Sequence, residues 1–163
     1  MSTLPNGLPP LFILYGSATG NSEHIAKEMQ AIATSLPPDQ KFFSSVYCGE
    51  LDSFKKKCLS TWETAPPAYK YPLLVISSTT GNGEAPENAN RFIRFIKRKQ
   101  TAETLPLKHC MYSVLGLGDT NYEKFCNVGK LLDKHLGELG GTRVMKLACA
   151  DEATGLEDVV EPW

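Results

Sequence analysis

The chain has 163 residues, which is enough for one domain with a single buried core. Its 42% hydrophobic and 21% charged residues are typical of a soluble globular protein, and no apolar run approaches the roughly 18 residues that a membrane helix needs. The formal net charge of -1 excludes a strong overall field toward nucleic acid or acidic lipid. We therefore expect a cytoplasmic protein without a nucleic-acid or membrane partner.

The beginning of the chain and the cysteines add two further expectations. Residues 1–10 are rich in proline, lack a signal-peptide pattern and are predicted to form a flexible leader before a domain at 11–163. The five cysteines are widely spaced without a C-x-x-C pair, so the sequence indicates neither a zinc site nor a thioredoxin motif. Reduced thiols in a cytosolic chain are the expected state.

The predicted elements alternate between strand and helix along the chain. Short apolar runs bounded by turn residues predict strands, and apolar residues at helical spacing predict helices. In chain order we expect a strand at 11–15, a helix at 22–36, a strand at 41–47, a helix at 51–62, a strand at 73–77, a helix at 87–99, a strand at 110–115, a helix at 127–139, a strand at 143–147 and the start of a last helix at 156.

Apolar stripes identify the buried face of each helix. The first stripe is Ile25, Met29 and Ile32, the second is Phe92, Phe95 and Ile96, and the third is Val128, Leu131, Leu132, Leu136 and Leu139. Gly140 and Gly141 follow the third stripe, where a left-handed cap prefers glycine.

Alternating strands and helices predict an α/β fold with a five-stranded parallel sheet covered by helices on both faces. We expect the strand order 2-1-3-4-5, in which a ligand binds beyond the carboxyl ends of the strands, beside the switch between strands 1 and 3. The loops after strands 1, 3 and 4 should therefore carry the chemistry. All three are polar and contain glycine.

The loop after the first strand, residues 16–22, leads into a helix N-terminus, where free N–H groups and the helix dipole favour an anion. It contains the hydroxyls of Ser17, Thr19 and Ser22 but no lysine or arginine. It also lacks both the G-x-x-x-x-G-K-[ST] and the G-x-G-x-x-G patterns, which excludes a triphosphate loop and a dinucleotide fingerprint. The loop suits one phosphate monoester, although alone it is equally consistent with a capped polar turn.

The loops at 77–86 and 116–127 contain glycines that permit close approach to a flat ligand. Tyr122 in the third loop can stack on an aromatic ring. Taken singly, these loops are better explained as a surface connection and a surface tyrosine that packs on the next helix. Their combination at three neighbouring strand ends is a much stronger signal.

Three segments resemble the FMN-binding loops of the flavodoxin-like domains in diflavin reductases. These segments are Ser17-Ala18-Thr19-Gly20-Asn21-Ser22, Ser78-Thr79-Thr80-Gly81 and Gly116-Leu117-Gly118-Asp119-Thr120-Asn121-Tyr122. The resemblance covers residues 11–163, nearly the whole chain. Residues 125–134 and 155–163 are most similar to the branch whose electron acceptor is methionine synthase, and a related branch serves iron–sulfur assembly.

The resemblance implies an FMN site made by the three loops. Residues 17–22 would hold the phosphate, residues 78–81 one side of the flavin, and residues 117–126 the other side. The implied cofactor-binding residues are Ser17, Ala18, Thr19, Gly20, Asn21, Ser22, Ser78, Thr79, Thr80, Gly81, Asn82, Leu117, Gly118, Asp119, Tyr122, Phe125, Cys126 and Glu152. Thr80 replaces an aromatic residue common in the family, and Glu152 stands where an aspartate is usual.

No catalytic side chain and no metal site is expected, because the cofactor carries the chemistry in such a domain. The resemblance implies one-electron transfer from a reductase module that holds FAD and NADPH, in the remainder of a longer protein, to an acceptor protein such as methionine synthase. Other possibilities stay open: a stand-alone flavodoxin, the soluble diflavin reductase of iron–sulfur assembly, or a non-redox module that binds FMN.

Overall fold

The computed structural model describes residues 10–17, 20–37, 39, 43, 45–59, 71–79, 86–98, 110–118, 126–144 and 147–151. Predictions that fall on the leader, on the helix expected from 156, or on most of the second and third loops lie outside these residues.

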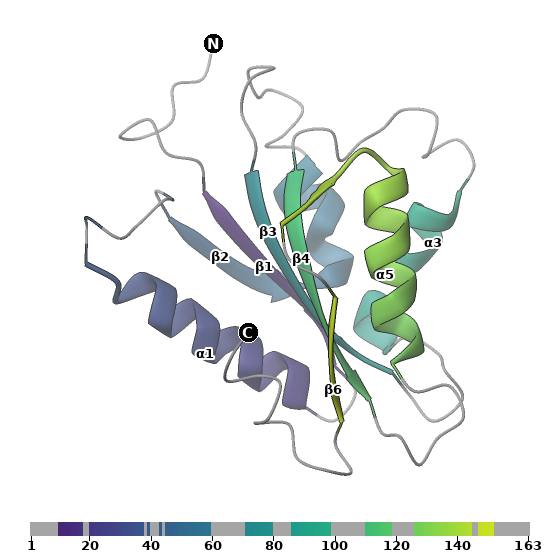
Figure 1. The fold of residues 1–163 in the computed structure, drawn as a ribbon, viewed down its shortest axis with the longest axis horizontal. Helices are drawn as coiled ribbons and strands as arrows, with labels where there is room; N and C mark the ends of the chain where they lie inside the picture. Colours follow the sequence, from purple (N-terminus) through teal and green to yellow (C-terminus); the bar gives the residue numbers. More distant parts are fainter. Residues whose placement is uncertain are drawn as a thin grey trace.

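A parallel sheet forms the centre of the molecule (Figure 1). Its strands are β1 (Leu11–Gly16), β2 (Val46–Glu50), β3 (Tyr71–Ser78), β4 (Cys110–Gly118), β5 (Thr142–Arg143) and β6 (Ala148–Asp151). The order is β2-β1-β3-β4-β5, with β6 also paired to β4, which confirms the predicted α/β fold and the order 2-1-3-4-5.

The strand register brings the ends of the central strands together at one edge of the sheet. Gly16 pairs with Ser77, Ser78 pairs with Leu117, and Gly118 pairs with Asp151. We call this the carboxyl edge. It is the edge at which the sequence places the three loops.

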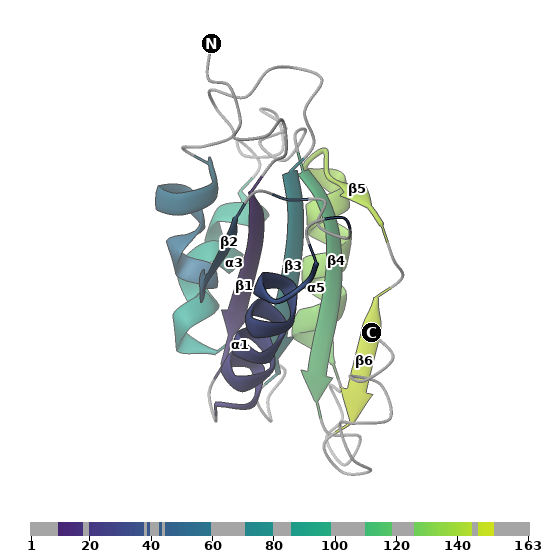
Figure 2. The same cartoon turned by 90° about the vertical axis from the view of Figure 1, so that its left-hand side faces the viewer.

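Helices cover both faces of the sheet, as predicted (Figure 2). Helix α1 (Asn21–Thr34) lies on one face, and α3 (Asn90–Lys97) and α5 (Asn127–Glu138) lie on the other. A short helical turn η5 (Glu87–Ala89) leads into α3. In place of a regular helix at 51–62, the described residues form a 3-10 turn η3 (Leu51–Ser53) and a π-helical segment η4 (Lys55–Leu59).

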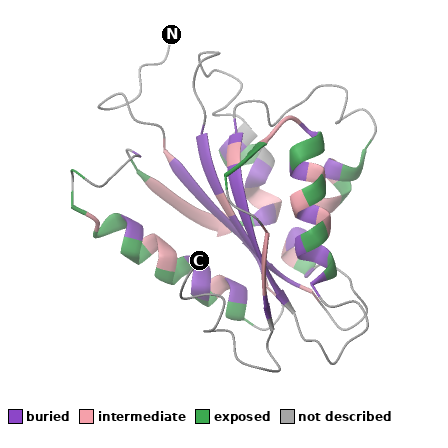
Figure 3. Cartoon of the chain, in the orientation of Figure 1, coloured by how far each residue is buried: buried purple, intermediate pink, exposed green. Residues whose placement is uncertain are grey.

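Two hydrophobic clusters hold these layers together, one on each face of the sheet. Successive strand residues point to opposite faces. Leu11 and Ile13 of β1 accordingly pack in the cluster under α1, whereas Phe12 and Leu14 pack in the cluster under α3 and α5. The central strands are almost entirely buried (Figure 3), as expected for a parallel sheet with both faces covered.

The predicted apolar stripe of the first helix is wrong at one position. Ile25 is buried, but Ile32 is 63% exposed. The residues of α1 that reach the sheet include Ala26 and Ala33, whose small side chains let the helix lie close to the strands. Those alanines turn the buried face away from Ile32, because each residue advances the helix by about 100°.

The predicted strand at 143–147 is also wrong in its bounds. Two shorter segments share the edge position beside β4: Thr142 and Arg143 pair near its start, and residues 148–151 pair near its end. Val144 between them is 60% exposed, so the apolar residues of this stretch do not mark one buried strand.

The expectation that all the thiols are reduced is wrong for one pair. The Sγ atoms of Cys126 and Cys149 are joined in a disulfide, with their Cα atoms 6.1 Å apart. The pair links the start of α5 to β6, a proximity that arises only when both segments pack beside β4. Cys48, Cys58 and Cys110 are free thiols, and burial raises the pKa of Cys58 far above its ordinary value.

Within the described ranges, no helix is long and apolar enough to cross a bilayer, and no three potential metal ligands cluster together.

Candidate functional site

The first loop is held at the carboxyl edge by two hydrogen bonds of Ser17. Its backbone N–H donates to the side-chain oxygen of Asn88, at 2.9 Å. Its hydroxyl accepts a hydrogen bond from the Gly20 N–H, also at 2.9 Å. The loop is therefore fixed on one side to the turn that precedes α3 and closed on itself just before α1.

Helix α1 begins from this loop with its N-terminus open. Gly20 is the N-cap in the left-handed region, at φ 98°, and no side chain in the described part of the chain caps the helix. A Cβ at Gly20 would meet no atom within 4 Å, so there is room beside the backbone at this point. The positive end of the helix dipole favours an anion here.

Ser22 in the first turn of α1 supplies the most specific feature of the site. Its side chain is fully buried, and its Oγ has no hydrogen-bond partner among the described residues. A buried hydroxyl without a partner costs about 1–3 kcal/mol, so a native structure normally satisfies it. A phosphate oxygen is an acceptor that would do so. The residues present therefore fit the phosphate group of FMN.

The second and third predicted loops leave their strands side by side. The Thr79 N–H donates to the Leu117 carbonyl at 3.0 Å, which continues the pairing of β3 and β4 beyond the strand end. The Thr79 Oγ1 accepts a hydrogen bond from the Val128 N–H at 3.1 Å. Thr79 thus joins β3 to both β4 and α5, and its hydroxyl serves the frame of the site.

Ser78 has a similar structural role. Its hydroxyl donates to the Gly16 carbonyl at 3.4 Å, so it connects the ends of β3 and β1. The side chain is 7% exposed.

Cys126 ends the third loop and begins α5. It is the N-cap of this helix at φ 57°, its side chain is fully buried, and the disulfide to Cys149 occupies its sulfur. Cys126 therefore positions the end of the loop.

A hollow of about 620 Å³ adjoins Ser17 on the side of β2 and α3. Its walls carry the carboxylates of Glu50, Asp52 and Glu87 and the guanidinium groups of Arg91 and Arg94; the other lining residues are Ser17, Asn88 and Asn90. Although the three loops are poor in basic residues, α3 thus brings positive charge to the neighbourhood of the first loop.

Sequence reasoning missed Asn88 as a residue of the site. Its side chain supports the first loop, 71 residues away in the chain. The available signal was its position just after the second loop, since strands 1 and 3 were already expected to be neighbours.

The structure brings together nine of the predicted site residues at or next to the carboxyl edge: Ser17, Gly20, Asn21, Ser22, Ser78, Thr79, Leu117, Gly118 and Cys126. The other nine lie outside the described residues: Ala18, Thr19, Thr80, Gly81, Asn82, Asp119, Tyr122, Phe125 and Glu152.

Comparisons with known proteins agree with the fold. The flavodoxin family model matches residues 13–163. The chain is 41% identical to methionine synthase reductase from Bos taurus, covering 93% of this chain and 20% of that protein. It is 33% identical to the sulfite reductase [NADPH] flavoprotein alpha-component from Thiocapsa roseopersicina, covering 91% of this chain and 25% of that protein.

Among solved structures, a cysteine-to-serine mutant of flavodoxin from Pseudomonas aeruginosa superimposes with a TM-score of 0.64 at 26% identity, covering 94% of this chain and 93% of the flavodoxin. Flavodoxin therefore matches the chain over almost its whole length. By contrast, the chain spans only about a fifth of the length of the methionine synthase reductases that it resembles.

Proposed function

The chain belongs to the flavodoxin family, and from that premise we propose that it is the electron-relaying FMN domain of a diflavin reductase. The observation that carries the assignment of the phosphate site is the buried Ser22 hydroxyl in the first turn of α1, which has no partner among the described residues and lies next to a loop held in place by Ser17 and Asn88.

FMN is the cofactor of this domain, and it supplies the ability to accept and release electrons one at a time. The protein's own residues do the binding. Ser22 and the open N-terminus of α1 would hold the phosphate, and the loops that leave β3 and β4 would enclose the ring. Ser78 and Thr79 fix the strand ends from which those loops start.

The relatives suggest where the electrons come from and where they go. We propose that a module with FAD and NADPH sites supplies them and that methionine synthase receives them, because several similar proteins are methionine synthase reductases. The flavoprotein component of sulfite reductase is also similar, so the general electron-transfer role has broader support than the particular acceptor.

The first experiment measures cofactor binding and its electron steps. FMN is added to flavin-free protein, and quenching of flavin fluorescence gives the affinity. A potentiometric titration of the complex should then show two separate one-electron steps. A single two-electron step would contradict the relay, and failure to bind FMN would remove the cofactor site itself.

A variant tests the role of Ser22 directly. Ser22→Ala should weaken FMN binding by about tenfold or more, because a hydrogen bond to a charged group contributes roughly 1.5–3 kcal/mol. The free energy of unfolding without FMN should stay the same or rise, because the change removes a buried hydroxyl that has no partner among the described residues.

The matched control is Ser35→Ala at the other end of α1, where the hydroxyl is exposed and donates to the Ile32 carbonyl. It should leave the FMN affinity unchanged. Equal affinities in both variants would contradict the assignment of Ser22 to the phosphate.

A further inference from the structure

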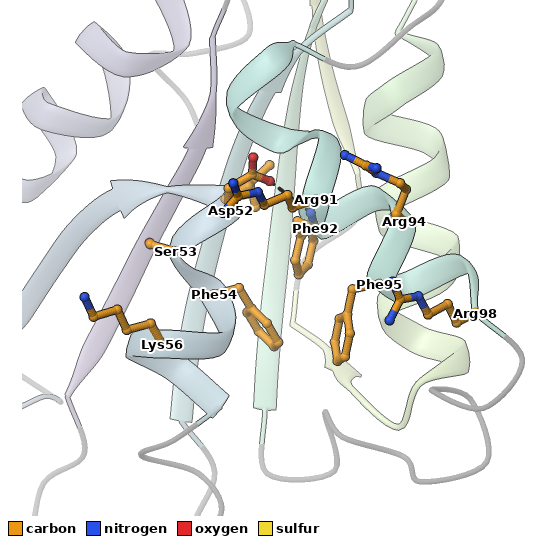
Figure 4. A pocket seen from close by; sticks show the side chains of 10 residues that line it. Asp52, Ser53, Phe54, Lys56, Arg91, Phe92, Arg94, Phe95 and Arg98 are labelled. Carbon is orange, nitrogen blue, oxygen red and sulfur yellow. Dashed lines mark hydrogen bonds between the residues drawn. The ribbon is translucent and has the colours of Figure 1, made fainter.

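A second concave surface lies on the flank of the molecule, between the turn and helical segment at residues 51–59 and helix α3 (Figure 4). We call it the α3 groove. Its volume is about 500 Å³, and its main lining residues are Phe54, Lys56, Arg91, Arg94, Phe95 and Arg98. The predicted loops that form the cofactor site contribute none of the residues that line it.

The groove is strongly basic for a chain of net charge -1. Lys56, Arg91, Arg94 and Arg98 line it, and Asp52 is the only carboxylate among the lining residues. Asp52 is already engaged, since its Oδ1 accepts a hydrogen bond from the Phe92 N–H at 2.9 Å. Within the described part of the chain, no carboxylate forms an ion pair with any of the three arginines.

The positive charge is not spread evenly along the groove. Glu50 and Glu87 lie in the neighbouring hollow, whose lining also includes both Arg91 and Arg94. Neither of them lines the groove, and Arg98 at the other end of the groove does not line that hollow. An anionic partner is therefore attracted most strongly to that second end.

The floor of the groove is a rigid aromatic layer. The ring of Phe54 lies 4.9 Å from that of Phe92 and 5.8 Å from that of Phe95, measured between centroids. Phe54 and Phe92 are only 1% and 2% exposed, and Phe95 is half-buried. The groove therefore offers one partly exposed apolar contact beneath a row of cations.

We propose that the α3 groove docks an extended, acidic segment of a partner protein. Arg91 and Arg94 lie on α3 and Arg98 follows as its C-cap residue, so the outer two lie about 10 Å apart along the helix axis at 1.5 Å per residue. A row of this length is too long for a single phosphate group. Two carboxylates on alternate residues of an extended chain, which lie roughly 7 Å apart, fit within this length.

Arginine suits this role because its planar fork binds carboxylates through two parallel hydrogen bonds. Single-stranded nucleic acid is the less favoured occupant, because it needs exposed aromatic faces on which bases stack, and two of the three rings are buried. Docking at the groove would leave the carboxyl edge open, so one partner segment can hold the protein while another surface meets the cofactor.

The test uses the flavin-free 163-residue chain, so that its outcome does not depend on FMN. The probe is a fluorescein-labelled octapeptide with glutamate at alternate positions and one phenylalanine, and binding is followed by fluorescence anisotropy. Wild type should bind this peptide at least tenfold more tightly than the same peptide with glutamine in place of glutamate. Affinity should fall as salt is raised.

The variant Arg94→Gln with Arg98→Gln should weaken peptide binding at least tenfold. The matched control is Lys97→Gln with Lys130→Gln, which removes the same charge from exposed residues that do not line the groove. The control should change the affinity less than twofold. Circular dichroism and thermal unfolding establish that both variants fold.

Any of several results would overturn the proposal. Three results concern the peptide itself: wild type shows no preference for the glutamate peptide, the arginine variant binds it as well as wild type does, or the lysine control weakens binding equally. Two more concern competitors: millimolar inorganic phosphate displaces the peptide, or a single-stranded oligonucleotide binds more tightly than the peptide. The last pair would identify a site for small anions or for nucleic acid.

Discussion

At the scale of single residues, Asn88 connects two parts of the site that are far apart in the sequence. Its side-chain oxygen accepts the hydrogen bond from the Ser17 N–H, while its own position is set by the turn before α3. The first loop therefore depends on the packing of α3 for its shape. Loss of this acceptor leaves the Ser17 N–H without its partner and the loop free to move.

We expect Asn88→Ala to weaken FMN binding by about three- to tenfold, because one hydrogen bond contributes roughly 0.5–1.5 kcal/mol. Fluorescence quenching measures the affinity. Asn90→Ala is the control, since Asn90 lines the same hollow whereas the Ser17 N–H donates to Asn88. If the two variants bind FMN alike, Asn88 does not position the loop.

At the scale of elements, α5 crosses β4 at very short distance. Two glycines meet at this crossing. A Cβ at Gly129 would lie 2.9 Å from the Cα of Gly116, and a Cβ at Gly116 would lie 3.2 Å from the Cα of Gly129. Backbone therefore rests on backbone, and neither side can take a methyl group without a shift of the helix.

Gly129→Ala should lower the free energy of unfolding by about 1–3 kcal/mol, the usual cost of overpacking. This direction is informative, because an exposed helical Gly→Ala change normally stabilises a protein by up to about 1 kcal/mol. Urea denaturation measures the effect. The control is Lys130→Ala, one residue further along on the exposed side of α5, which should change stability little. If Gly129→Ala is as stable as wild type, α5 does not pack on β4 in this way.

A comparison of α5 with α1 explains why some helix faces could be predicted from the sequence and others could not. The stripe of Val128, Leu132 and Leu136 is regular, so the sequence predicted α5 almost to the residue. The face of α1 is set by Ala26 and Ala33, which carry little hydrophobic signal, and Ile32 was assigned to the core although it is exposed. These alanines are buried because their side chains are small, and a search for periodic large apolar residues does not detect them.

The candidate site divides in a similar way. The hydroxyls of the first loop were predicted because local sequence, a strand followed by polar residues and a helix, determines them. The Asn88 contact and the pairing of Cys126 with Cys149 arise from tertiary packing, and neither leaves a local pattern. The groove beside α3 leaves no local pattern either, because it needs the segment at 51–59 as its other wall.

At the scale of the whole molecule, the sheet separates two hydrophobic clusters, and each contains a buried tyrosine. Tyr15 lies in the cluster under α1, and Tyr112 lies in the cluster under α3 and α5. Burial raises the pKa of both phenols above the ordinary value of 10.0, and for Tyr15 the carboxylate of Glu23 adds to the increase. The free energy of unfolding should therefore depend on pH in the alkaline range.

The direction of this linkage follows from the raised pKa values. Below about pH 10 these phenols are protonated in both the folded and the unfolded chain, so they add no pH dependence. Above about pH 10 the unfolded chain loses protons that the folded protein retains, and the free energy of unfolding must fall as pH rises. Urea denaturation from neutral to strongly alkaline pH should show a plateau followed by this fall.

Tyr15→Phe isolates the contribution of one cluster, because it keeps the ring and removes the ionisable group. The hydroxyl of Tyr112 donates to the Asp133 carbonyl at 3.0 Å, so Tyr112→Phe also loses a hydrogen bond and is the less clean variant. Tyr15→Phe should match wild type near neutral pH and lose less stability than wild type above about pH 10. Identical alkaline slopes would show that Tyr15 ionises as easily in the folded protein as in the unfolded chain, which would contradict a raised pKa of this phenol in the cluster under α1.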